Sequence, residues 1–393
     1  MRESDTVWMP GASPTRIACT ALDPPERALH DSPTLPLAAR RTPIIIDMFT
    51  HIFPAKCFGA LVKHAPYLAD TVEGIKRNKG LHDLDTRFRM MDGYGDYRQV
   101  VMLPNPPLEE MTTPETGAII AKVANDAMAE LVAAHPDRFA GFAAALPIHD
   151  MDAAMRELDR AIRELGAVGA QIYTNIDGRA LDEPAFAPFF DAMARYDLPI
   201  WIHPARAAGF PDYQTERRSR YLIWFCFGWP YETSAAMTRL VFSGLFDRHP
   251  GIKIITHHMG AMIPFLESRI SDGYAGWKYG WERSSPLTCY DDPWALAERT
   301  EHELAGQIMS SLKRPLIEYF KMFYADTALN GGHIGVRCGF DFFGLRNVVF
   351  STDAPFTTIP GTMDAVRSLG LPADQLDMVC RGNAERLLNR RFA

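Results

Sequence analysis

The sequence predicts an α/β protein built as a (β/α)8 barrel, a closed ring of parallel strands surrounded by helices. From residue 43 onward, short apolar runs alternate with longer amphipathic ones. The short runs are continuously apolar, as expected for strands buried on both faces of a parallel sheet. Eight such runs are present, the number that closes a barrel. An open doubly wound sheet is the alternative, but no GxGxxG segment opens a helix after an early strand.

The predicted strands are rich in Val, Ile, Phe and Ala. They cover residues 44–49, 98–103, 139–145, 167–173, 198–203, 252–257, 322–326 and 347–352. The runs between them have apolar residues at helical spacing and predict helices. These helices lie at about 114–136, 151–165, 182–196, 232–247, 299–319 and 332–343, with a closing helix at 373–390.

Residues 1–42 are proline-rich and have neither helical nor strand periodicity, so we expect a poorly ordered N-terminal extension. Residues 43–393 form the expected barrel domain. Two connections, at about 53–97 and 271–300, are longer than a barrel needs and predict loop insertions that act as lids or interfaces. Four aromatic residues of the second connection favour a homodimer or homotetramer. They are Tyr274, Trp277, Tyr279 and Trp281.

The composition excludes several classes of function. The 393-residue chain has a formal net charge of −7 and no basic stripe, which argues against a nucleic-acid partner. The longest strongly apolar run, 221–229, is too short to cross a membrane. The six cysteines are widely spaced and include no CxxC pair, so we expect a reducing compartment and a cytoplasmic protein.

Polar side chains end four of the predicted strands. His51 ends the first, His203 the fifth, His258 the sixth and Asp353 the eighth. The carboxyl ends of barrel strands meet at one mouth, so these groups should converge there. Two imidazoles and a carboxylate are enough for an open divalent metal site. The fourth of these groups would then lie beside the metal and carry out acid/base chemistry.

Two neighbouring positions refine this site. Strand side chains alternate, so Phe49 should face the same mouth as His51, where a His-x-His pair would have supplied another ligand. His257 and His258 are adjacent and should face opposite ways. We assign His258 to the site because it precedes the Gly260 turn, and we expect His257 to pack beneath a helix.

A linked set of short segments between about residues 44 and 388 carries a family resemblance. The set comprises residues 46–54, 89–92, 201–204, 230–233, 242–244, 249–250, 258–260, 265–270, 351–355 and 382–387. It resembles the amidohydrolase-related family, which includes 2-amino-3-carboxymuconate-6-semialdehyde decarboxylase and the resorcylate and dihydroxybenzoate decarboxylases. The resemblance implies a TIM barrel of the metal-dependent hydrolase type.

The resemblance also implies one divalent metal held by residues matching His51, His203 and Asp353, with His258 as the acid/base group. The family pattern usually has His or Glu where this chain has Phe49, a departure that bears on metal affinity. Zinc is expected for an open three-ligand site, and manganese is the alternative if oxygen ligands dominate. No organic cofactor is expected.

The activity that the resemblance implies is non-oxidative decarboxylation of a planar hydroxylated aromatic or unsaturated carboxylic acid. Asp353 or a water held by the metal would protonate the carbon, and His258 would stabilise the developing charge. We expect substrate contacts from Phe49 as a stacking face, Arg77 or Arg206 on a second carboxylate, and Trp229 in the pocket wall. Two alternatives remain. One is hydrolysis of an ester, lactone, amide or C–C bond at the same site, and the other is a metal-free, non-catalytic binding protein.

Overall fold

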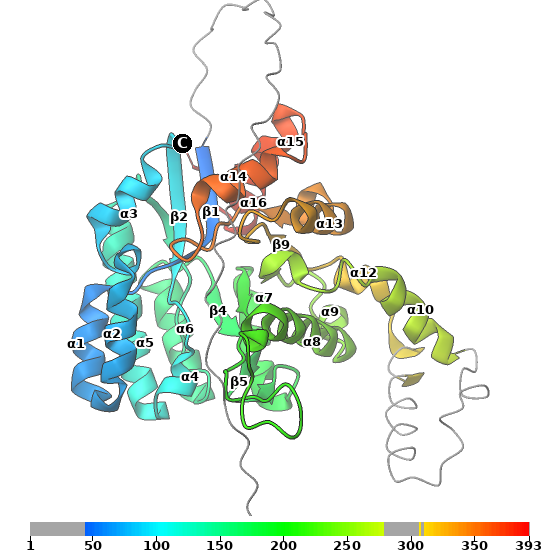
Figure 1. Ribbon diagram of the computed structural model, residues 1–393, viewed down its shortest axis with the longest axis horizontal. Helices are drawn as coiled ribbons and strands as arrows, with labels where there is room; N and C mark the ends of the chain where they lie inside the picture. The colour runs from blue at the N-terminus through cyan, green and yellow to red at the C-terminus, as the bar shows by residue number, and fades with distance from the viewer. Residues whose placement is uncertain (1–43, 279–305, 308–309, 393) are drawn as a thin grey trace, which may run out of the picture. The chain divides into compact units, whose positions relative to one another are not determined.

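The computed structural model describes residues 44–278, 306–307 and 310–392, and this part of the chain contains the eight-stranded barrel (Figure 1). The strands are β1 (Ile44–His51), β2 (Asp96–Met102), β3 (Phe139–Phe142), β4 (Ala170–Tyr173), β7 (Ile200–His203), β8 (Ile254–Thr256), β9 (Tyr324–Asp326) and β10 (Val348–Val349). They pair in parallel as two arcs, β1-β2-β3 and β10-β9-β8-β7-β4. All eight predicted strands are confirmed.

The two arcs are joined at both seams, so the ring is closed. Thr50 pairs with Ala354 at one seam, and Ala144 pairs with Ala170 at the other. At the first seam, His51 N also donates to Ala354 O at 2.8 Å. The interior of the ring is packed with side chains from alternating strand positions, among them Met48, Val100 and Trp201. The barrel is therefore a solid core whose function must lie at one end.

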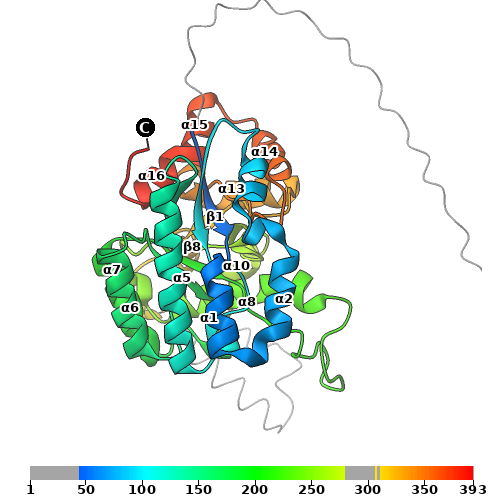
Figure 2. The same cartoon turned by 90° about the vertical axis from the view of Figure 1, so that its left-hand side faces the viewer.

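Helices cover the outside of the ring. They are α1 (Ala55–His64), α2 (Ala69–Arg77), α3 (Leu84–Met91), α4 (Leu108–Met111), α5 (Pro114–Ala134), α6 (Met151–Arg163), α7 (Ala187–Tyr196), α8 (Trp229–Phe242), α9 (Leu245–Arg248), α10 (Glu267–Lys278), α12 (Leu316–Phe320), α13 (His333–Phe343), α14 (Ile359–Arg367), α15 (Ala373–Asp377) and α16 (Asn383–Leu387). A short hairpin, β5 (Asn175–Ile176) with β6 (Arg179–Ala180), follows β4. Figure 2 shows α1, α5, α6 and α7 side by side on one flank. No helix in the described ranges is long and apolar enough to cross a membrane.

Capping explains where several helices start. The Asp150 carboxylate accepts the Ala153 N–H at 3.0 Å and begins α6. The Asp83 carboxylate accepts the Thr86 N–H at 3.0 Å and begins α3. Pro114 occupies the first turn of α5, where its missing N–H costs nothing. These local signals place the helices between the strands, as the apolar spacing predicts.

The connection at 53–97 differs from its prediction. It is not a loop insertion but three helices, α1 to α3, joined by short turns. Its helical apolar spacing is visible in α2, where Val72 and Ile75 are buried three residues apart. Of the connection at 271–300, the start lies in α10 and residues 279–300 lie outside the described residues, as do the side chains of Tyr274 and Trp277. The extension at 1–42 also lies outside them.

Candidate active site

The candidate site lies at the carboxyl ends of the strands. His51 is the last residue of β1 and His203 the last of β7, while His257 and His258 follow β8 and Asp353 follows β10. A cavity of about 860 Å³ opens at this mouth. Its lining combines polar groups with a wall of aromatic rings: His203, His258, Asp353, Arg206, Trp224, Phe225, Trp229 and Phe356. This is the size and chemistry of a small-molecule site.

Each of three buried imidazoles uses its Nδ1 for a short contact to an oxygen. His51 Nδ1 lies 3.0 Å from Leu103 O, and His203 Nδ1 lies 2.7 Å from Pro204 O. His257 Nδ1 lies 2.6 Å from Asp326 Oδ2. An acceptor at Nδ1 fixes the Nδ1–H tautomer and leaves the lone pair of Nε2 for a ligand.

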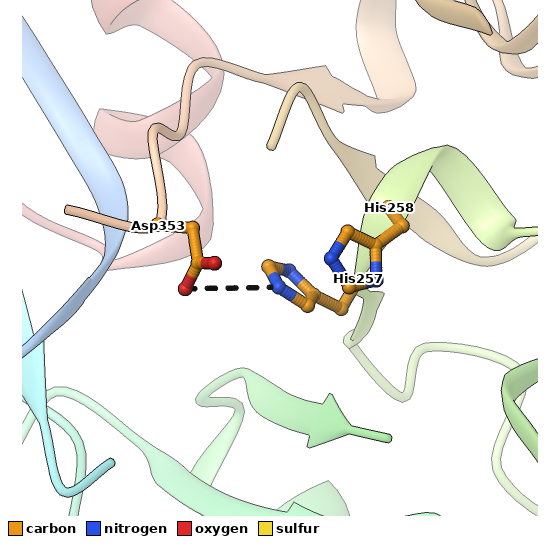
Figure 3. Close-up of side chains that lie close together, drawn as sticks. All are labelled: His257, His258 and Asp353. Atoms are coloured by element: carbon orange, nitrogen blue, oxygen red, sulfur yellow. Dashed lines mark ion pairs between the residues drawn. The ribbon is translucent and has the colours of Figure 1, made fainter. Parts of the chain in front are cut away.

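Asp353 provides an oxygen next to these nitrogens. Its Oδ1 lies 3.1 Å from His51 Nε2 and 3.9 Å from His257 Nε2, and the second of these approaches is drawn in Figure 3. All three atoms are buried, and none has a hydrogen-bond partner in the described chain. Ligand atoms of His257, His258 and Asp353 all lie within 4.8 Å of one another, a spacing that could hold a metal ion.

Burial also sets the protonation of these groups. It lowers the pKa of His51 to about 4 and that of His203 to about 3, so both imidazoles are neutral at pH 7. It lowers the pKa of His257 and of His258 well below the ordinary value. Burial, reinforced by the nearby charge of Asp326, raises the pKa of Asp353 well above its usual range. Neutral imidazoles are the form that binds metals.

The assignment of His257 to a helix-covered position is wrong. Its side chain is fully buried inside the site, and Figure 3 shows its ring between Asp353 and His258. His258 also lines the cavity, as predicted. Strand alternation fails here because β8 ends at Thr256 and the His258 backbone is left-handed, with φ 56°. Both imidazoles therefore face the site.

The prediction that Phe49 offers a stacking face to substrate is also wrong. Phe49 is only 1% exposed and does not line the cavity. Its ring instead stacks on His257 with 4.0 Å between centroids and approaches the His51 ring edge-on at 5.0 Å. Imidazole rings of the site therefore cover the faces of the Phe49 ring that could have contacted substrate.

Two of the remaining predicted substrate contacts reach the cavity and one does not. Arg206 and Trp229 line it. Arg206 Nη1 donates to Glu232 Oε1 at 2.9 Å, so that edge of the guanidinium is occupied. Trp229 places its ring 5.4 Å from that of His203. Arg77 ends α2 with an exposed side chain and does not line this cavity.

Asp326 is a site residue that the sequence reading missed. It is fully buried at the end of β9, and its Oδ1 accepts the N–H of His258 at 2.9 Å and that of Ala328 at 3.2 Å. Like the other site residues, Asp326 is a polar residue at the end of an apolar run, and this pattern could have revealed it. Nothing in the sequence showed that His257 would be its partner.

Known proteins resemble this chain over most of its length. The amidohydrolase family model matches residues 46–390. A γ-resorcylate decarboxylase from Rhodococcus jostii is 32% identical over 288 residues, which cover 70% of this chain and 78% of that protein. A 2-amino-3-carboxymuconate-6-semialdehyde decarboxylase from Dictyostelium discoideum is 33% identical over 161 residues, 41% of this chain and 43% of the relative.

A solved structure extends the similarity to the whole barrel. The dihydroxybenzoic acid decarboxylase of Polaromonas sp. JS666, crystallised with manganese and the inhibitor 2-nitroresorcinol, is 26% identical with a TM-score of 0.66. The match covers 88% of this chain and 98% of that one. The resemblance found in the sequence is confirmed, and the chain belongs to the amidohydrolase family.

Proposed function

We propose that this protein is a metal-dependent, non-oxidative decarboxylase of a planar hydroxylated aromatic carboxylic acid. The observation that carries the proposal is the convergence of buried, unpartnered imidazole and carboxylate atoms at the mouth of an aromatic-walled cavity. The decarboxylases among its relatives support this chemistry over the other reactions that the fold hosts.

The donor set fits a divalent cation. His51, His203 and Asp353 would hold it, with zinc and manganese as the two candidates. When bound, the metal supplies Lewis-acid stabilisation of the negative charge that develops on a substrate oxygen. The unpartnered Nε2 of His51 and Oδ1 of Asp353 support this assignment, because buried polar atoms otherwise require hydrogen-bond partners.

The residues of the chain supply the rest of the reaction. Decarboxylation replaces a carboxylate by a hydrogen, so the bond to CO2 breaks and one proton must reach the ring carbon. Asp353 is the proposed donor, since its carboxyl group lies in the cavity wall. His258 is the proposed acid/base partner from the same wall, and its Nδ1 has no partner in the described chain. Trp229 and the rings beside it exclude water and lie along the planar substrate.

The test is product analysis with metal-loaded protein. Carboxyl-labelled 2,6-dihydroxybenzoate and other ortho-hydroxylated benzoates should yield labelled CO2 and the corresponding phenol. Asp353→Asn and His258→Asn should lower kcat by at least about 100-fold. Cleavage of an ester or lactone without CO2 release would favour the hydrolase. Absence of bound metal after loading would favour the binding protein instead.

We also propose a homodimer or homotetramer in the cytoplasm. Large apolar side chains near the mouth are exposed, with Phe265 at 83% and Ile334 at 88%. The four cysteines in the described chain are free, which suits a reducing compartment. Light scattering after size-exclusion chromatography tests the assembly, and a monomer at micromolar concentration would contradict it.

A further inference from the structure

Phe49 occupies the place of a metal ligand among the imidazoles of the site. Its ring lies 4.0 Å from the His257 ring, 5.0 Å from that of His51 and 5.7 Å from that of His203. A phenyl ring at this position offers no donor atom to a cation. If the other ligands were unchanged, the site would have one ligand fewer than a His-x-His pair provides.

His257 has the features expected of the metal ligand that Phe49 cannot supply. Its ring is fully buried, and its Nδ1 is held by the Asp326 carboxylate at 2.6 Å. A carboxylate on the far nitrogen is the usual partner of a metal-binding histidine, because it fixes the ring and makes Nε2 more basic. The Nε2 of His257 has no partner in the described chain.

Two distances to Asp353 Oδ1 suit neighbouring ligands of one metal ion. His51 Nε2 lies 3.1 Å from this oxygen and His257 Nε2 lies 3.9 Å from it. Tetrahedral ligands with bonds of about 2.1 Å are separated by about 3.4 Å. The two observed separations bracket that value.

The packing of Phe49 against His257 also restrains the position of the imidazole ring. The two rings are nearly parallel, with an angle of 20° between their planes. The phenyl face therefore supports the imidazole on one side, while Asp326 restrains it in its own plane. A smaller or polar residue at position 49 would leave this ring less restrained.

We infer that His257 replaces position 49 as a metal ligand, so that the metal site of this chain consists of His51, His203, His257 and Asp353. This inference rests on the metal site of the proposed function. It leaves His258 outside the ligand set, as the acid/base group in the cavity wall. The positive charge of the ion would also compensate the negative charge of the Asp326 and Asp353 carboxylates. Neither carboxylate pairs with a Lys or Arg in the described ranges.

The deciding variant is His257→Asn, with His249→Asn as the matched control, because His249 also pairs with an aspartate (Asp191, 2.7 Å) but does not line the cavity. The asparagine amide can still donate to Asp326, but it has no atom in place of Nε2. We expect the dissociation constant for Zn²⁺, measured by competition with a chelator, to rise at least about 30-fold in His257→Asn. In His249→Asn it should change less than about threefold. Circular dichroism of both variants in EDTA serves as the folding control.

Two further measurements test the role of His257 without relying on the single variant His257→Asn. X-ray absorption of the zinc-loaded wild type should show three imidazole ligands, against two if His257 does not bind. Adding Phe49→His to His257→Asn should recover at least about tenfold in affinity, because it restores an imidazole at the neighbouring position. Two imidazoles in the wild type, or unchanged affinity in His257→Asn, would overturn the inference and leave the proposed function standing. A wild type that binds no metal would overturn the proposed function itself.

Discussion

Asp326 controls how the His257 ring lies, through one charged hydrogen bond at 2.6 Å. We expect Asp326→Asn to weaken Zn²⁺ binding by about 10- to 100-fold, the usual effect of removing a carboxylate that orients a metal-binding histidine. Chelator competition measures it. Asp341→Asn is the control, because that carboxylate is 65% exposed on α13. Equal affinity in both variants would show that Asp326 does not orient a ligand.

Glu109 is a buried acid outside the metal site. It lies in α4 with 7% exposure, and its Oε1 has no partner in the described chain. Burial, with a smaller contribution from the charge of Glu110, raises the pKa of Glu109 from 4.5 to about 8. A carboxyl group with a raised pKa in the folded state stabilises the fold fully below pH 4.5. That contribution is lost as pH rises through about 8.

We therefore expect Glu109→Gln to become more stable relative to wild type as pH rises. The gap in the free energy of unfolding should grow by about 4 kcal/mol between pH 5 and pH 8.5, since each pKa unit corresponds to about 1.4 kcal/mol. Urea unfolding at the two pH values measures it. Other titrating groups are common to both proteins and cancel in the difference. A gap that does not change with pH would mean that Glu109 is ionised in the folded protein.

At the residue scale, sequence reasoning predicted the chemistry and most of the residues that meet at the mouth, but not how their side chains lie. His51, His203, His258 and Asp353 end apolar runs, and strand ends meet at one mouth in any parallel barrel. The orientation of His257 was not predictable, because alternation holds only as far as Thr256. The burial of Phe49 among imidazoles depends on contacts between β1, β7 and the turn after β8, which no local pattern contains.

Arg87 joins several elements beneath the site. It lies in α3 with 2% exposure and donates to His51 O in β1, to Gln99 Oε1 in β2 at 2.8 Å and to Gly80 O at 3.1 Å. Its fourth contact is with the Thr50 hydroxyl at 3.0 Å. One guanidinium thus fixes the end of the strand that carries His51, a proposed metal ligand.

We expect Arg87→Met to cost about 3 kcal/mol of folding free energy, because it leaves buried carbonyl groups without donors. Urea unfolding measures the loss. Arg89→Met is the matched control on the same helix, since its side chain is exposed and donates to Thr86 in the same turn. The control should change stability by less than about 0.5 kcal/mol. A similar small effect in Arg87→Met would show that the network is not needed for stability.

At the element scale, the strands were predictable and the helices of the connection at 53–97 were not. Buried parallel strands leave continuous apolar runs that survive without any tertiary information. The sequence predicts loops at 53–97 because glycine, proline and charged residues interrupt its apolar residues. The structural role of these apolar residues is apparent only in the folded protein, where α1 packs against α5 (Figure 2).

For the molecule as a whole, metal and stability should be linked. Ligands on β1, β7 and the turns after β8 and β10 belong together only in the folded barrel, so the ion binds the folded state. Above the dissociation constant, each tenfold rise in free Zn²⁺ should add about 1.4 kcal/mol to the free energy of unfolding. Unfolding in metal buffers measures it, and stability independent of free metal would contradict a site shared by four strands.

The barrel itself was predictable because eight apolar runs with helices between them admit few other folds. Its closure was not visible in the sequence, since the bonds at the seam join residues far apart in the chain. Asp47 accepts the N–H of Thr352 at 3.0 Å, and the two residues are 305 positions apart.

That seam has a consequence for how the protein is made. At about 5 to 20 residues per second, roughly 15 to 60 s separate the synthesis of Asp47 from that of Thr352. Throughout this interval β1 has no β10 to pair with, and His51 has no Asp353 beside it. A nascent chain can therefore hold no complete set of ligands until its last strand has left the ribosome. With the proposed ligands, metal would therefore bind only after the last strand is made, and bound metal would mark chains whose barrel has closed.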